Sequence, residues 1–185
     1  MNPFQEKKLR YLFDLLDINN NGYIQLNDFE DIAFKLIEKY NIEEGSKKQT
    51  YVAQKCVGFF YELIKVIPAE NHRTITADEW CSFFDKALIQ NATHETVEEY
   101  RDLFFDFLFG IFDENHDGYI SREEYHKLFE IYGIGKDHLD EAFDSLDIFK
   151  DGRLSKYELI NALEVFLTSD NPKDRGNIMF GKIGD

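Results

Sequence analysis

Two twelve-residue segments of this 185-residue chain repeat the same pattern of oxygen-bearing side chains. Residues 17–28 and 113–124 align without a gap. Each has Asp at the first position, Asp or Asn at the third and fifth, Gly at the sixth and an acid at the twelfth. The residue frequencies of the chain would supply on the order of 0.005 such windows by chance. The repeat is typical of a calcium-binding loop between two helices, and such a helix–loop–helix unit is a hand.

The spacing suits calcium because the ion takes roughly six to eight hard oxygen ligands. Side chains at positions one, three and five converge only if the backbone turns sharply. Gly22 and Gly118 permit that turn, since a residue without Cβ tolerates positive φ. The seventh carbonyl adds a ligand, and the twelfth acid closes the cage. The predicted ligands are Asp17, Asn19, Asn21, the Tyr23 carbonyl and Asp28 in one loop, and Asp113, Asn115, Asp117, the Tyr119 carbonyl and Glu124 in the other.

A third loop, residues 147–158, matches the pattern at the first, fifth, sixth, eighth and twelfth positions. Phe149 stands at the third position, where a phenyl ring supplies no oxygen, so water must replace that ligand or it is lost. The remaining charge leads us to expect calcium here as well. The alternative is a hand kept only for packing. The predicted ligands are Asp147, Asp151, the Arg153 carbonyl and Glu158.

The remaining hand is visible only in its helices. Apolar residues stand eight, five, four and one positions before each recognisable loop, and the same spacing precedes Pro68. This identifies residues 68–79 as a loop, with Ile75 at the eighth position and Glu79 at the twelfth. Pro68 replaces the first acid, and Arg73 replaces the glycine with a cation where the metal would lie. We expect no calcium in this hand.

Four hands predict an all-α fold of two pairs, because a single unit cannot bury its apolar faces alone. The apolar eighth residues of paired loops should form short two-stranded β ribbons. We place the first pair in residues 1–90, with its second hand degenerate, the second pair in residues 91–168, and a tail packed on the body in residues 169–185. The alternative for the tail is a frayed terminus. With 18 Phe and 10 Tyr, the halves should pack into one compact body.

The tail carries a further signature, the segment Gly176-Asn177-Ile178-Met179-Phe180-Gly181. Together with four hands, an irregular first linker and a decayed second loop, it resembles the sarcoplasmic calcium-binding protein family, which includes calexcitin and calerythrin. The resemblance covers essentially the whole chain. It implies a compact fold of four EF-hands, a cytosolic location, and calcium binding in a subset of hands as a buffer or signal modulator.

The acid at the twelfth position of the first loop is Asp, whereas Glu is usual there. Asp28 lacks the methylene that lets Glu bring both oxygens to the ion, so it binds more often through one oxygen. Magnesium, which prefers six ligands at shorter distance, is then penalised less. We expect two or three Ca²⁺ ions, with Mg²⁺ also able to bind the first loop and the tighter calcium site in residues 113–124. The alternative is that backbone adjustment cancels the difference.

Charge and composition limit the other partners. The net charge of −15 repels a nucleic acid backbone or an anionic membrane surface. The chain has no run of 18 apolar residues, and residues 1–10 lack the apolar stretch of a signal peptide, so we expect a cytoplasmic protein. We also expect a monomer.

Three functions are compatible with this pattern. A buffer binds ions without opening a large groove, and the family resemblance favours it. A sensor exposes an apolar groove to a protein target, and such grooves are often rich in Met, of which this chain has two. A photoprotein-like chain would enclose an apolar luciferin, although aromatic stripes at helical spacing usually form a core. The five His residues form no recognisable catalytic cluster, so we expect a calcium buffer and no enzyme.

Overall fold

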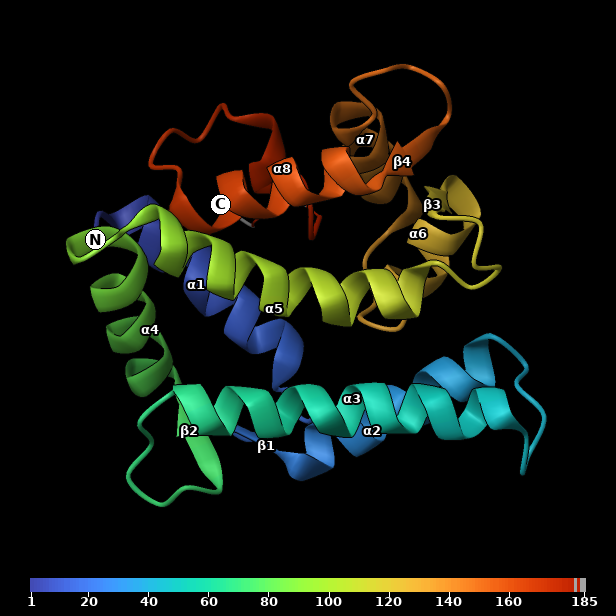
Figure 1. Ribbon diagram of the computed structural model, residues 1–185, viewed down its shortest axis with the longest axis horizontal. Helices are drawn as coiled ribbons and strands as arrows, with labels where there is room; N and C mark the ends of the chain where they lie inside the picture. Colours follow the sequence, from blue (N-terminus) through green and yellow to red (C-terminus); the bar gives the residue numbers. More distant parts are fainter. Residues whose placement is uncertain (182, 184–185) are drawn as a thin grey trace.

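The computed structural model describes residues 1–181 and 183, which form eight α-helices and four short strands (Figure 1). The first half contains α1 (Pro3–Leu16), β1 (Tyr23–Gln25), α2 (Leu26–Lys39), α3 (Lys47–Val66), β2 (Thr74–Thr76), α4 (Ala77–Asp85) and the π-helical turn η1 (Lys86–Gln90). The second half contains α5 (His94–Phe112), β3 (Tyr119–Ser121), α6 (Arg122–Glu130), α7 (Lys136–Leu146), β4 (Arg153–Ser155), α8 (Lys156–Thr168) and the 3₁₀ turn η2 (Arg175–Ile178). The predicted all-α class is confirmed.

The ribbons join the loops in the predicted pairs. Strand β1 pairs antiparallel with β2, and Ile24 lies opposite Ile75. Strand β3 pairs with β4 in the same way, and Ile120 lies opposite Leu154. All four side chains are fully buried. The apolar eighth residue of each loop therefore links the two hands of a pair through backbone bonds and core packing.

The outgoing helix of most hands begins with a capping box, in which the first and last residues of one turn satisfy each other's amides. Ser121 Oγ accepts from Glu124 N, and Glu124 Oε2 accepts from Ser121 N at 2.8 Å. Ser155 with Glu158, and Thr76 with Glu79, form the same box. The twelfth loop residue is thus also the third residue of a helix, which holds its carboxylate over the loop.

Aromatic side chains join the two halves into one core. Helix α5 lies between α3 and α8 (Figure 1). The rings of Phe59 and Phe107 stack with centroids 4.2 Å apart and an interplanar angle of 4°. Phe29 meets Phe107 edge-on, and Trp80 meets Phe104 in the same way. The buried residues of both pairs consequently form a single hydrophobic cluster.

The segment after α8 turns back onto the body. Asn177, Met179 and Phe180 are all buried. The Phe180 ring meets Phe129 of α6 and Phe166 of α8 edge-on, with centroids 5.8 and 4.7 Å away. Residues 182, 184 and 185 of the predicted tail lie outside the described residues. Among the helices of the described part, none is long and apolar enough to span a bilayer.

Candidate metal centres

Three loops share one backbone turn. In each of them the fourth and sixth residues have positive φ, which bends the chain around the space enclosed by the loop. The φ values of the three pairs agree closely: they are 56° and 87° for Asn20 and Gly22, 59° and 84° for His116 and Gly118, and 57° and 82° for Lys150 and Gly152. The loop that contains Phe149 therefore has the same shape as the two with complete ligand patterns.

The first acid of each of these loops holds the turn from inside. One carboxylate oxygen accepts from the amide of the fifth residue and the other from that of the sixth. All three acids are buried. The bonds run from Asn21 N and Gly22 N to Asp17 (3.1 and 2.7 Å), from Asp117 N and Gly118 N to Asp113 (3.0 and 3.1 Å), and from Asp151 N and Gly152 N to Asp147 (3.2 and 3.0 Å).

In both hands of the second pair, the acid at the twelfth loop position lies in the first turn of the outgoing helix and closes the loop. Glu124 Oε1 accepts from Glu114 N at 3.0 Å, while its other oxygen caps α6. Glu158 Oε1 accepts from Ile148 N at 2.8 Å and from Phe149 N at 3.0 Å, while its other oxygen caps α8. Both side chains are buried. The loop of residues 147–158 is closed in the same way as that of residues 113–124.

The first hand is closed differently because its acid is shorter. Asp28 Oδ2 accepts from Gln25 N at 2.9 Å, but Oδ1 accepts from the side-chain amide of Asn19 at 2.6 Å. To bind an ion, Asn19 would have to turn its amide so that the oxygen faces the metal. Burial raises the pKa of Asp28. Because a carboxylate ligand must be deprotonated, ion binding at this hand should weaken as the pH falls toward that pKa.

The loop of residues 68–79 has another turn. Its positive φ falls on the fifth residue, His72 (53°), instead of the fourth and sixth. The side chain of Asn71 accepts from Arg73 N at 2.9 Å and from Thr74 N at 2.8 Å. Glu79 still closes the loop, since its Oε1 accepts from Glu70 N at 2.8 Å. Side chains of the loop itself thus hold it in shape.

The donor atoms fit calcium, which prefers carboxylate, amide and carbonyl oxygens. Within residues 1–181 and 183, no three Asp, Glu, His or Cys side chains form a ready-made metal cluster. In the third hand, Asp117 Oδ1 accepts from Tyr119 N at 2.9 Å and Oδ2 from Asn115 Nδ2 at 3.2 Å. Calcium binding would exchange part of these bonds for contacts with the ion.

One side chain near the fourth hand was not considered in the sequence analysis, which used only the carbonyl of Arg153. The Nε atom of Arg153 lies 3.3 Å from Asp151 Oδ2, and its guanidinium carbon Cζ lies 3.7 Å from the ring centroid of Tyr119. The cation therefore competes for an oxygen of a predicted ligand. Its partner ring comes from the neighbouring loop, so the contact follows from strand pairing and has no local sequence signal.

A family model described as an EF-hand domain pair matches residues 6–130. The chain belongs to the EF-hand family. It is a calcium-binding EF-hand protein, and its resemblance to the sarcoplasmic calcium-binding proteins is confirmed by its relatives. Calexcitin-1 of Caenorhabditis elegans is 28% identical, over 99% of this chain and 89% of the relative. Calerythrin of Saccharopolyspora erythraea is 23% identical, over 86% and 89%.

Solved structures share the fold of this EF-hand protein. The calcium-loaded apo form of the coelenterazine-binding protein from Renilla muelleri superposes with a TM-score of 0.80 at 19% identity, covering 98% of this chain and 99% of the other. A sarcoplasmic calcium-binding protein from amphioxus superposes with a TM-score of 0.75 at 20% identity, covering 98% of each chain. These likenesses show that the fold is shared over nearly the whole chain.

Replacing Phe149 by Asp should raise the calcium affinity of the fourth hand about tenfold, because it restores the missing oxygen ligand at the third position. Phe149 is 61% exposed, so the fold should lose little stability. Calorimetric calcium titration measures the effect. Tyr157→Asp is the matched control, since it adds the same charge at the eleventh position from a side chain that is 62% exposed. An equal gain in calcium affinity in both variants would show that the added charge, and not a restored ligand, causes the effect.

Replacing Asp28 by Glu should raise the preference of the first hand for calcium over magnesium, because the longer acid can bring both oxygens to the larger ion. Calcium titrations with and without millimolar magnesium measure this preference. Asp31→Glu, which makes the same change on the exposed side of α2, is the control. Unchanged magnesium competition in Asp28→Glu would contradict our explanation of the short acid.

Proposed function

We propose that this EF-hand protein binds two or three Ca²⁺ ions, in the hands whose loops begin at Asp17, Asp113 and Asp147, and acts as a cytoplasmic calcium buffer. The observation that carries the proposal is the shared turn of these three loops, each held by a buried acid at its first position. The loop that begins at Pro68 has a different turn and no acid there, so we assign it no ion.

Electrostatics supports binding of several ions. The chain has a net charge of −15, so its carboxylates repel one another in the absence of cations. Each bound Ca²⁺ offsets two of these charges. Because the loops are shaped only in the folded chain, the ions should also stabilise the fold by mass action. Magnesium would share the first hand when calcium is scarce.

A buffer is favoured over a sensor because the helix faces that would line a target groove are already covered. Phe84, Phe143 and Phe166 are fully buried. Phe180 of the tail fills the space between α6 and α8, where a target helix would otherwise find an apolar surface. The second hand, without an ion, would not open in response to calcium. A protein target remains the alternative function, and the chain would act as a monomer in either case.

Photoprotein-like ligand binding is disfavoured by the size of the interior. The cavity between the halves, lined by residues such as Leu12, Phe104, Phe107 and Tyr132, measures about 20 Å³. This is room for about one water molecule. The similarity to the coelenterazine-binding protein concerns the fold, and a luciferin would require the core to be repacked. We propose no catalytic residues.

Isothermal calorimetry should count two or three calcium ions per chain. Glu124→Gln should remove one of them, because it removes the negative charge of the closing acid and replaces one of its oxygens by an amide donor beside the ion. Glu158→Gln tests the fourth hand in the same way. The matched control is Glu79→Gln, which changes the corresponding acid of the second hand and should remove none. Loss of an ion in the control, or fewer than two ions in the parent protein, would refute this assignment.

Fluorescence of a hydrophobic dye tests the buffer function. With a closed core and a docked tail, the full chain should bind little dye, and calcium should change the signal little. Phe180→Ala serves as a positive control, since removal of the ring opens apolar surface between α6 and α8. A large calcium-induced rise in the parent protein would favour the sensor function instead.

A further inference from the structure

The tail is fitted into the fold so closely that it requires glycine at one point. A Cβ atom on Gly176 would lie 2.5 Å from the backbone oxygen of Ala162 and 2.7 Å from Cβ of Val165, both in α8. Such distances force the chain to shift, because one of the atoms belongs to the backbone of a helix. The tail thus rests directly on α8, and a single methyl group would lift it.

A buried lysine binds the tail to α1. The Lys8 side chain is almost fully buried, and its ammonium donates to Ser169 O at 2.6 Å, to Asn177 Oδ1 at 2.9 Å and to Val165 O at 3.4 Å. All three acceptors are uncharged. Burial lowers the pKa of Lys8 to about 8. Undocking the tail would remove acceptors from a buried cation, which is costly unless water replaces them.

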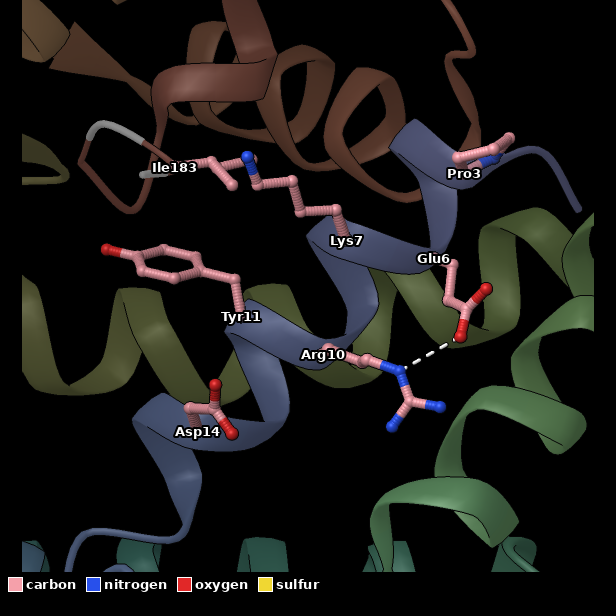
Figure 2. A pocket seen from close by; sticks show the side chains of 7 residues that line it. All are labelled: Pro3, Glu6, Lys7, Arg10, Tyr11, Asp14 and Ile183. Carbon is pink, nitrogen blue, oxygen red and sulfur yellow. Dashed lines mark hydrogen bonds and ion pairs between the residues drawn. The ribbon is translucent and has the colours of Figure 1, made fainter. Parts of the chain in front are cut away.

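Two tyrosine hydroxyls from different helices donate hydrogen bonds to consecutive carbonyls of the tail. Tyr11 of α1 donates to Phe180 O at 2.8 Å, and Tyr125 of α6 donates to Met179 O. Figure 2 shows Tyr11 projecting from α1 on the side where Ile183 lies, beside an open surface groove. The tail therefore connects the incoming helix of the first hand with the outgoing helix of the third.

Tyr125 directly follows Glu124, the acid that closes the third hand. Its ring stacks on Phe112, the last residue of α5 before the loop, with centroids 5.6 Å apart and an interplanar angle of 6°. Its hydroxyl reaches the tail from the same position. One position of α6 therefore satisfies both sets of contacts: Glu124 closes the loop, and Tyr125 and Phe129 contact the tail.

We propose that the docked tail is a positioning element of the third hand, which holds α6 in the closed place through Tyr125 and thereby raises the calcium affinity of that hand. Since coupling between two binding equilibria is reciprocal, calcium in the third hand also holds the tail in place. The inference rests on the proposed binding of calcium in residues 113–124, and it adds a determinant of affinity that lies more than 50 residues away in sequence.

Calcium titration of Gly176→Ala tests the positioning. The methyl group should displace the tail and lower the affinity of the third hand about tenfold, while the other hands change less. Gly58→Ala is the matched control, because a Cβ on Gly58 of α3 would meet nothing within 4 Å. Tyr125→Phe, which keeps the ring and removes only the hydroxyl bond, should lower the same affinity several-fold even if Gly176→Ala folds poorly.

Hydrogen exchange gives a readout that general destabilisation would not produce. Calcium should slow amide exchange in residues 169–181 of the parent protein, and Glu124→Gln should abolish that protection although ions still bind elsewhere. If Glu124→Gln removes no ion, the assignment of the third hand fails. A different result would overturn the coupling alone. In that case Glu124→Gln removes one ion, but Gly176→Ala and Tyr125→Phe bind calcium as tightly as Gly58→Ala, and calcium does not protect the tail from exchange.

Discussion

The rest of the structure depends on one acid in each hand that has two tasks. The twelfth loop residue caps the outgoing helix through one oxygen and closes the loop through the other, as Glu124 and Glu158 show. The position of the helix and the shape of the loop are therefore set by the same side chain. An ion that attracts this acid acts on the helix as well, which is the physical basis for coupling between metal binding and packing.

The second hand lacks the acid at the first loop position, yet it keeps the contacts that close the loop and cap the outgoing helix. Glu79 still caps α4 and accepts from Glu70 N, and Asn71 replaces the first acid in holding the turn. Ile75 still pairs with Ile24 across the ribbon. The first hand needs that partner, because one helix–loop–helix unit cannot cover its own apolar faces. A hand that we assign no ion thus remains essential for packing.

Aromatic stacking and the tail make the protein a single closed body. The contact between Phe59 and Phe107 joins the halves, and Phe180 covers the apolar surface between α6 and α8. A core of rigid rings has little room to repack, whereas grooves that open for targets rely on flexible side chains such as Met. This favours an ion-binding role in which the shape changes little.

The sequence by itself determined the fold class, the pairing of hands and the positions of the loops, because ligand spacing and helix periodicity are local within a dozen residues. It also identified Pro68 and Phe149 as departures from the pattern. Only the tertiary structure placed Arg153 over the ring of Tyr119 and joined the tail to Lys8 and Tyr125. These contacts depend on how strands pair and helices pack, and packing between residues far apart in sequence leaves no periodic signal in the chain.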